Sequence, residues 1–236
     1  MKLETQYKKY ELVHDDTIVV EGKKLYRIRA LKSFGDVKEG DLGGYVESYK
    51  KLEVSGDAWV YGNARVYGDA QVSGDAWVSG DTQVYGNAQV SGNARVHGNA
   101  QVSGDAQVSG DAWVSGDTQV YGNAQVYGNA RVYGNARVYG DAQVYGDAQV
   151  YGDAQVYGDA HVHSQMDIIT VLDIGSERGC LTIYRDSKIA IRVTRGCFTG
   201  SIGEFLEAVE GTHGDNMHGR IYKSLIETAK IQFGID

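Results

Sequence analysis

The sequence predicts a mainly β protein organised around a parallel β-helix with 18-residue triangular coils. Between Val54 and His161 the motif V-x-G-[ND]-A-x repeats every six residues, eighteen times in succession and without an insertion. Only Thr82 and Thr118 replace the alanine of the repeat. A period this short and strict is typical of a stacked solenoid, in which each unit packs only on its neighbours.

The residue types of the repeat indicate how one unit folds. Valine favours strands, whereas glycine followed by asparagine or aspartate favours bends. Val and Ala should point inward, and the residues that flank Val along the strand should point outward. Gly with Asn or Asp suits a corner because these residues tolerate positive φ. Three corners close a triangle, so the eighteen units should form six coils with a total height of about 29 Å.

Residues 1–41 are expected to form an N-terminal β cap. Thr17–Val20 and Lys24–Leu31 have the pattern of two strands, and Glu21-Gly22 between them is a hairpin signal. Met1–Tyr10 is polar and is expected to form a short helix or a frayed arm. A hairpin at this position would cover the exposed strand edges of the first coil.

Residues 42–163 are expected to form the hexapeptide solenoid. Leu42–Glu47 is already in register with the later valines. The unit Ser48–Glu53 is degenerate, with Ser48 at the valine position and Leu52 at the alanine position. Atypical terminal repeats of this kind commonly cap a solenoid.

Residues 164–236 are expected to form a small α+β module that can cap the other end of the rod. Three segments have strand patterns and are separated by turns: Asp167–Ile174, Cys180–Arg185 and Lys188–Thr194. Ser201 and Glu204 form a capping box that should open a helix ending near Gly211. Asp215 or Asn216 should open a last helix that ends near Phe233.

The repeats resemble a known family. The pattern V-[YS]-G-[ND]-A-[QRW] is similar to that of the hexapeptide left-handed β-helix. VYGNARVYGDA, preceded by DLGGYVES, resembles the YdcK-type β-solenoid family, which is common among phage and prophage proteins. The resemblance extends from about Leu25 to Val162 and implies a left-handed coil, which the composition does not show. The motif is specific for fold and says almost nothing about function.

Charge restricts the classes of partner. The net charge is −8, and the repeats contribute four Arg and eleven Asp without any Lys or Glu. An acidic rod argues against direct nucleic-acid binding and leaves room for a basic protein partner. Corner residues eighteen positions apart should stack, and there Asp mostly alternates with Asn, which lowers repulsion between like charges. We interpret the corner charges as solubilising.

Other sequence features argue against membranes and bound groups. The sequence has no apolar run of about 18 residues and no signal-peptide pattern, so we expect a soluble, cytoplasmic protein. Cys180 and Cys197 are too few for a disulfide framework. The chain has no Cys/His metal spacing, phosphate loop or pair of carboxylates, so we expect neither a metal nor a cofactor.

A stripe of tryptophans is the most distinctive outward-facing feature. Stacking of residues eighteen apart aligns Trp59, Trp77, Arg95 and Trp113. Arg95 can then lie on a neighbouring indole as a cation–π contact. We expect the second residues of the same units beside the stripe: Ser55, Ser73, Ser91 and Ser109. Trp and Arg are favoured at interaction hot spots, so the stripe is a candidate surface for self-association or for a protein partner. Its alternative role is mutual stacking, and the family resemblance implies an oligomer such as a trimer.

Two enzymatic alternatives remain open. Cys197, His213 and Asp215 are residue types that can serve as nucleophile, base and orienting acid. Cys197 can equally pack as a small hydrophobic residue, and His213-Gly214-Asp215 also has the pattern of a helix end. The other alternative follows from hexapeptide acyltransferases, which use a histidine at a subunit interface. The available histidines are His97, His161 and His163. No loop interrupts the repeats, so no wall for an acyl-donor cleft is expected.

The sequence therefore predicts a non-enzymatic, phage- or prophage-type β-solenoid that acts as a rigid scaffold or protein-binding factor. Val72–Gln89 and Val108–Gln125 are identical, which indicates duplication and suits a spacer of variable length. A narrower version of this hypothesis is a factor that binds and blocks a host protein. The alternatives are a hexapeptide acyltransferase-like enzyme and a glycan-binding fibre component that uses the tryptophan stripe as a sugar platform.

Overall fold

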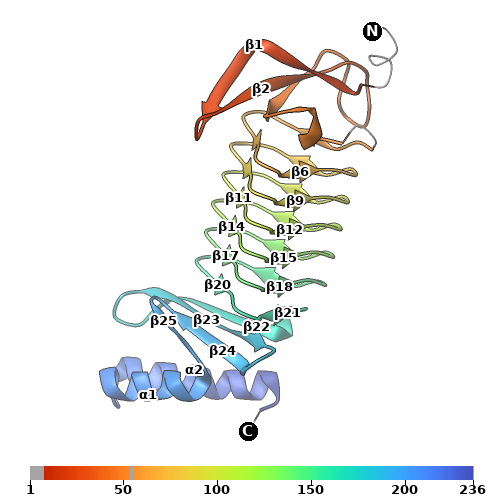
Figure 1. Ribbon diagram of the computed structural model, residues 1–236. Helices are drawn as coiled ribbons and strands as arrows, with labels where there is room; N and C mark the ends of the chain where they lie inside the picture. Colours follow the sequence, from red (N-terminus) through yellow and green to blue (C-terminus); the bar gives the residue numbers. More distant parts are fainter. Residues whose placement is uncertain (1–7, 54–55, 236) are drawn as a thin grey trace.

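The computed structural model describes residues 8–53 and 56–235. Within them the repeats form a parallel solenoid of about six turns, as the sequence predicts. Each turn contributes one short strand to each of three faces, and every repeat strand pairs in parallel with strands eighteen residues away. Arg95 and Val96, for example, pair with Trp113 and Val114. Figure 1 shows the coils stacked between a hairpin at one end and a mixed module at the other.

The strands of each face are given in the order of the stack. The first face contains β4 (Trp59–Val60), β7 (Trp77–Val78), β10 (Arg95–Val96), β13 (Trp113–Val114), β16 (Arg131–Val132) and β19 (Gln149–Val150). The second contains β5 (Arg65–Val66), β8 (Gln83–Val84), β11 (Gln101–Val102), β14 (Gln119–Val120), β17 (Arg137–Val138) and β20 (Gln155–Val156). The third contains β6 (Gln71–Val72), β9 (Gln89–Val90), β12 (Gln107–Val108), β15 (Gln125–Val126), β18 (Gln143–Val144) and β21 (His161–Val162).

The interior and the corners explain why the repeat is so strict. The repeat Val and Ala side chains from Ala58 to Val162 are buried, as are the two substituting threonines. At the corners positive φ falls on the glycine alone, for example 78° at Gly98, and not on the Asn or Asp that follows. A Cβ on Gly98 would lie 2.9 Å from the backbone nitrogen of Gly116 in the next coil. Glycine is therefore required for both its conformation and its close stacking.

The corner Asn and Asp residues use their side chains instead of positive φ. Asn99 Nδ2 donates to Asp117 Oδ1 at 2.7 Å. Five further Asn–Asp pairs eighteen residues apart are joined in the same way in the described chain. The alternation seen in the sequence is thus a ladder of hydrogen bonds that run along the rod.

The N-terminal cap is a hairpin that continues into the solenoid. β1 (Tyr10–Val20) pairs antiparallel with β2 (Lys23–Ala30), which pairs antiparallel with β3 (Leu42–Val46). β3 then pairs in parallel with β5, but Val46 lies opposite Val66, twenty residues away, so Leu42–Glu47 is not in the register that the six-residue period predicts. β1 is longer than the predicted strand because Tyr10 packs into the core of the first coils. The short helix or frayed arm expected for Met1–Tyr10 lies mostly outside the described residues.

The degenerate unit was also placed in the wrong register from the sequence, because Val46, and not Ser48, lies opposite Val66. Leu52 bridges Val72 in parallel, and Glu53 N donates to Val72 O at 2.9 Å. The valines of the following coils make this same pairing, so the buried Leu52 occupies the valine position and not the alanine position. A 3₁₀ turn, η2 (Tyr49–Lys51), directly precedes it.

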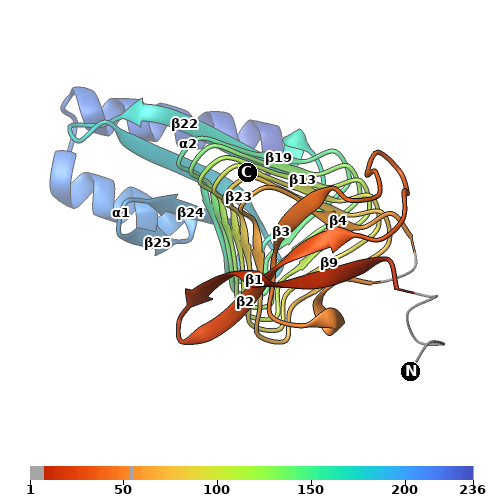
Figure 2. The same cartoon turned by 90° about the horizontal axis from the view of Figure 1, so that it is seen from above.

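The C-terminal module contains an antiparallel sheet and two helices. The sheet has the order β22 (Ile168–Ile174), β23 (Gly179–Asp186), β24 (Ala190–Arg195) and β25 (Phe198–Gly200). It is preceded by η3 (Gln165–Asp167) and followed by α1 (Ile202–His213) and α2 (Met217–Phe233). The sequence predicted three of these strands and both helices, but β25 is too short to show a periodicity. Figure 2 shows that the module extends beyond the outline of the coils.

Strand β23 closes the last coil. Gln155 N donates to the hydroxyl of Thr182 at 3.3 Å, and Tyr157 N donates to the hydroxyl of Tyr184 at 3.1 Å. Tyr184 belongs to the same buried cluster as the repeat valines. The left hand of the coil and the domain boundaries stay predictions. No helix in the described residues is long and apolar enough to cross a membrane.

Candidate functional site

The outward residues of the first face form a column along the rod. Strand pairing places Trp77, Arg95, Trp113 and Arg131 directly one above another on β7, β10, β13 and β16. Both arginines are exposed, Trp77 is half-buried, and Trp113 is 39% exposed. These four residues are called the Trp–Arg face below. Arg131 could be placed on this column from the sequence, but it was not among the site residues predicted there.

Cations and indole rings alternate along this face. Arg95 Cζ lies 5.7 Å from the Trp77 ring centroid and 5.9 Å from that of Trp113, so the predicted cation–π contact is confirmed. Arg131 Cζ lies 5.9 Å from the Trp113 centroid on the next coil. Guanidinium groups of neighbouring coils therefore lie against the indoles, and Trp113 has one above and one below.

His97 joins the face beside Trp113. The indole N–H of Trp113 donates to His97 Nε2, and the two ring centroids are 5.4 Å apart. Burial, followed by the nearby charge of Arg95, lowers the pKa of His97. A neutral imidazole is the form that can accept this hydrogen bond.

Trp59 does not belong to the exposed stripe, contrary to the prediction. Its side chain is fully buried. The ring of Phe34 lies 5.4 Å away and that of Tyr10 lies 6.2 Å away, both edge-on. Both residues come from the N-terminal cap, which covers the first coil. The repeat pattern contains no information about this cover, so periodicity alone could not reveal it.

The residues beside the stripe also differ from those predicted. The corner of each unit lies between its second and sixth residues, so these two positions occupy different faces. Ser73, Ser91 and Ser109 accordingly lie beside the third face, and Ser55 lies outside the described residues. The residues that follow the valines of the first face lie beside the stripe: Tyr61, Ser79, His97, Ser115, Tyr133 and Tyr151. Two serines and His97 thus flank the middle of the stripe, and tyrosines flank its ends.

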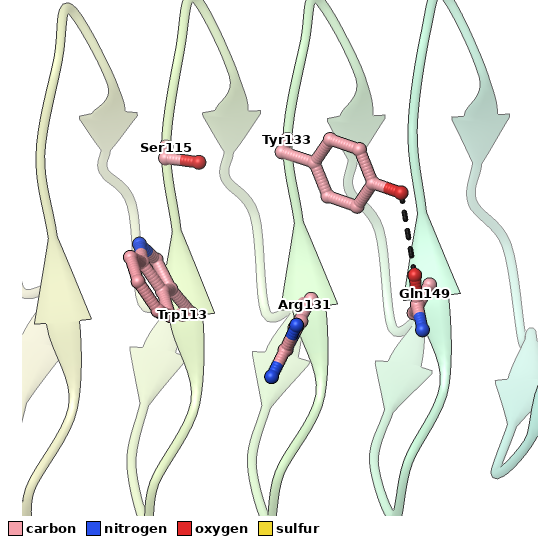
Figure 3. Close-up of a pocket in the computed structure, with 5 residues that line it drawn as sticks. All are labelled: Trp113, Ser115, Arg131, Tyr133 and Gln149. Carbon is pink, nitrogen blue, oxygen red and sulfur yellow. Dashed lines mark hydrogen bonds between the residues drawn. The ribbon is translucent and has the colours of Figure 1, made fainter.

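Two shallow hollows mark the Trp–Arg face. One, of about 400 Å³, is lined by Asp75, Trp77, Asn93, Arg95, Asp111 and Trp113. The other, of about 230 Å³, is lined by Trp113, Ser115, Arg131, Tyr133 and Gln149. Figure 3 shows Trp113, Arg131 and Gln149 in line on successive strands, with the Tyr133 hydroxyl donating to Gln149 Oε1 at 3.3 Å. Open hollows of this size suit protruding side chains better than an enclosed small molecule.

The structure brings together two of the three residues of the predicted nucleophilic site. Cys197 and His213 line one cavity of about 290 Å³ between the sheet and the helices, together with Phe205 and Tyr222. Asp215 is exposed, and its Oδ1 accepts a hydrogen bond from Lys223 Nζ at 2.8 Å. That bond lowers the pKa of Asp215. The carboxylate expected to orient His213 is therefore bound to a lysine of α2.

The three candidate acyltransferase histidines do not share one face. His97 lies on the first face, whereas His161 belongs to β21 of the third face at the far end of the rod. His163 follows β21, and its ring lies 4.9 Å from that of Tyr145. Among residues 8–53 and 56–235, no three His, Cys, Asp or Glu side chains are grouped so that they could hold a metal ion.

Comparison with known families agrees with this geometry. The model of the YdcK β-solenoid repeat matches the chain seven times, at residues 58–72, 70–86, 88–104, 106–122, 124–140, 130–146 and 148–164. The repeat region of the chain is therefore a YdcK β-solenoid, as the wording of its repeats indicated. No curated protein matches the chain in sequence.

Proposed function

We propose that this protein is a non-enzymatic, rigid scaffold that binds a protein through the Trp–Arg face. The observation that carries the proposal is the pair of exposed arginines, Arg95 and Arg131, held between or against indoles. Neither guanidinium has an ion-pair partner in the described part of the chain. Preorganised Arg and Trp side chains on a rigid sheet lose little conformational freedom when they bind, which favours a hot spot.

The surroundings of the face support a protein partner over a glycan. Sugars stack on open aromatic ring faces, whereas the Trp113 ring has Arg95 on one side and Arg131 on the other. The surface thus offers indole edges and the N–H donors of two guanidinium groups, with acidic corner residues on both sides. This combination suits a polar, hydrogen-bonding protein surface.

The coils themselves support the non-enzymatic part of the proposal. Each described repeat strand pairs with strands eighteen residues away without a register shift, so among residues 56–162 no loop projects from the coils to wall off a substrate. Fixed, regular strands of this kind position a surface rather than a moving catalytic group. The occurrence of the family among phage and prophage proteins extends the proposal to a factor that binds and blocks a host protein.

Site-specific crosslinking tests the proposal. A photoreactive benzoylphenylalanine replaces Ser115 beside the face, and the matched control replaces Ser91, the equivalent half-buried residue beside the third face. Position 115 should yield a discrete protein adduct in the producing cells, and position 91 should not. The Arg95→Glu/Arg131→Glu background should abolish the adduct, whereas Cys197→Ala and His213→Ala should leave it unchanged.

Two outcomes would contradict the proposal. One is the absence of any adduct at position 115. The other is the same set of adducts at positions 115 and 91, because the face would then have no preference over the rest of the rod.

A further inference from the structure

We infer that the Trp–Arg face pairs with the same face of a second copy of this chain, with the two rods antiparallel. The inference rests on the proposed protein-binding role of this face and names its partner. An isologous contact brings one surface against itself, so the surface must complement its own image under a two-fold axis. When that axis lies in the interface and is perpendicular to the rod, the order along each column is reversed in the second copy.

The stripe is complementary to its own reversed order. The sequence of residues along it is Trp77, Arg95, Trp113, Arg131, so reversal places every arginine opposite a tryptophan. With the axis midway between β10 and β13, Arg95 faces Trp113 of the second copy, and Trp77 faces Arg131 of the second copy. This position of the axis is also the middle of the six-strand first face.

The neighbouring column is complementary in size. In the same register, Ser79 faces Tyr133 of the second copy, and His97 faces Ser115 of the second copy. Tyr133 is 37% exposed, and Ser115 lines one of the two hollows of the face. In the four inner coils each large side chain therefore meets a small one, as close packing across an interface requires, and the outermost Tyr61 would face Tyr151 of the second copy.

Over the four inner coils, both corner columns that border the face are complementary in charge. On one border Asp81 would face Asn135 and Asn99 would face Asp117 of the second copy. In these coils the other border has the order Asp75, Asn93, Asp111, Asn129, so each of its aspartates also meets an asparagine, whereas Asp57 and Asp147 at its ends would face each other. An Asn–Asp contact offers a charge-assisted hydrogen bond, like those already present along each rod.

A parallel pair lacks this fit. A two-fold axis along the rod exchanges the two borders, so Asp75 would face Asp81 and Asp111 would face Asp117 at equal heights. Arg95 would then face His97 instead of an indole. Like charges opposite each other are unfavourable, so the columns favour the antiparallel arrangement.

The size of the face predicts a weak contact. Six coils are about 29 Å high, and a strand with its two corners is about 15 Å wide. Each copy would bury on the order of 450 Å², for a total of about 900 Å², which is below the range of stable complexes. We therefore expect a dimer that forms and dissociates with concentration.

The orientation can be tested by exchanging charged residues within one chain. The dissociation constant of the dimer is measured by sedimentation equilibrium. Arg95→Glu removes the cation that faces Trp113, and Trp113→Lys places a lysine opposite Arg95 of the second copy. Each single variant should raise the dissociation constant at least about tenfold. The double variant R95E/W113K restores opposite charges twice per antiparallel dimer and should dimerise better than either single variant. Arg137→Glu, an exposed arginine at the same repeat position on the second face, is the matched control and should leave the constant unchanged.

Each other outcome overturns the inference. A wild-type protein that stays monomeric at all concentrations has no such dimer, and a trimer has the wrong symmetry. A double variant no better than the single variants excludes the antiparallel register, provided that circular dichroism shows all variants folded. If the wild type is monomeric but position 115 still crosslinks another protein, the inference fails and the proposed function stands. If nothing crosslinks, both fail.

Discussion

Tyr184→Phe should loosen the C-terminal end of the solenoid. In the inner coils the N–H after each valine donates to the valine carbonyl of the next coil, as Tyr139 N does to Val156 O at 3.0 Å. Tyr157 has no following coil, and its N–H donates instead to the Tyr184 hydroxyl, which in turn donates to Tyr157 O at 3.3 Å. Tyr184 is fully buried, and burial raises its pKa, so the phenol stays a neutral donor.

The size of the effect follows from the groups that lose their partner. Phenylalanine keeps the ring in the core and leaves one N–H and one C=O of Tyr157 unpaired. An unsatisfied polar group costs about 1–3 kcal/mol, and the lower limit applies here because both contacts are only partly buried. The sum is about 2 kcal/mol, which corresponds to a factor of about 30 in a local opening equilibrium.

Hydrogen–deuterium exchange measured by mass spectrometry can resolve this change. The peptide that contains β20 and Tyr157 should exchange about 30-fold faster in Tyr184→Phe than in the wild type. Tyr133→Phe is the matched control, because its hydroxyl makes only an exposed contact with Gln149 at 3.3 Å. Unchanged exchange at Tyr157 in a folded Tyr184→Phe variant would refute the idea that this hydroxyl replaces a missing coil.

Three further predictions concern the corners and the N-terminal cap. Gly98→Ala should cost more than the roughly 1–2 kcal/mol of positive φ, because its Cβ would lie 2.9 Å from the next coil. In Gly62→Ala the nearest atom is 3.7 Å away, so its urea midpoint should fall less, and equal shifts would contradict the steric argument. Asn123→Asp creates four stacked aspartates, at positions 105, 123, 141 and 159, and should lower the melting temperature at low salt with recovery at high salt. Failure to recover would exclude charge as the cause. Burial lowers the pKa of Lys9 from 10.5 to about 8, so the unfolded chain binds more protons between these values. Stability should therefore rise with pH from about 8 towards 10, and Lys9→Met should remove that rise in the urea midpoint.

The sequence was sufficient for the solenoid because every contact inside it is local or has a fixed separation. Val96, for instance, meets Val78 and Val114, and the period alone identifies both. The same rule gave the cation–π contact of Arg95. The residues beside the stripe were predicted wrongly because the second and sixth residues of a unit were placed on the same face. The corner lies between these two positions and leads the chain onto the next face.

Contacts between unlike segments could not be read from a period. Trp59 is buried by Phe34 of the cap, more than twenty residues earlier and outside any repeat. Asp215 is held by Lys223, one of several lysines and arginines near it in the sequence. In both cases the partner is selected by how non-repetitive segments pack, and a single sequence contains no pattern for that choice.

The two ends of the rod differ from its middle in the charges of their corners. Among the described corner columns, Asp lies directly over Asp at only two steps, Asp57–Asp75 near the N-terminal cap and Asp141–Asp159 near the C-terminal module. Burial lowers the pKa of Lys9, whereas the charges of Asp57 and Asp75 both raise it. Lys188 binds Asp159 at 2.8 Å, and that bond and then the charge of Asp141 raise its pKa. Like charges are thus stacked only where a flanking module supplies a cation.

The alternation of Asn and Asp at the corners and the alternation of Trp and Arg on the Trp–Arg face both follow from a repeated unit of two coils. Val72–Gln89 and Val108–Gln125 are identical and begin 36 residues apart, which is two coils. Duplication with this spacing puts Trp77 and Trp113 two coils apart with Arg95 between them, and it keeps Asn and Asp in alternate coils. When two residue types alternate along a column over an even number of coils, reversing the column places each type opposite the other. The same duplication therefore has two effects. It keeps like charges apart along the corner columns, and it makes the Trp–Arg face fit an antiparallel copy of itself.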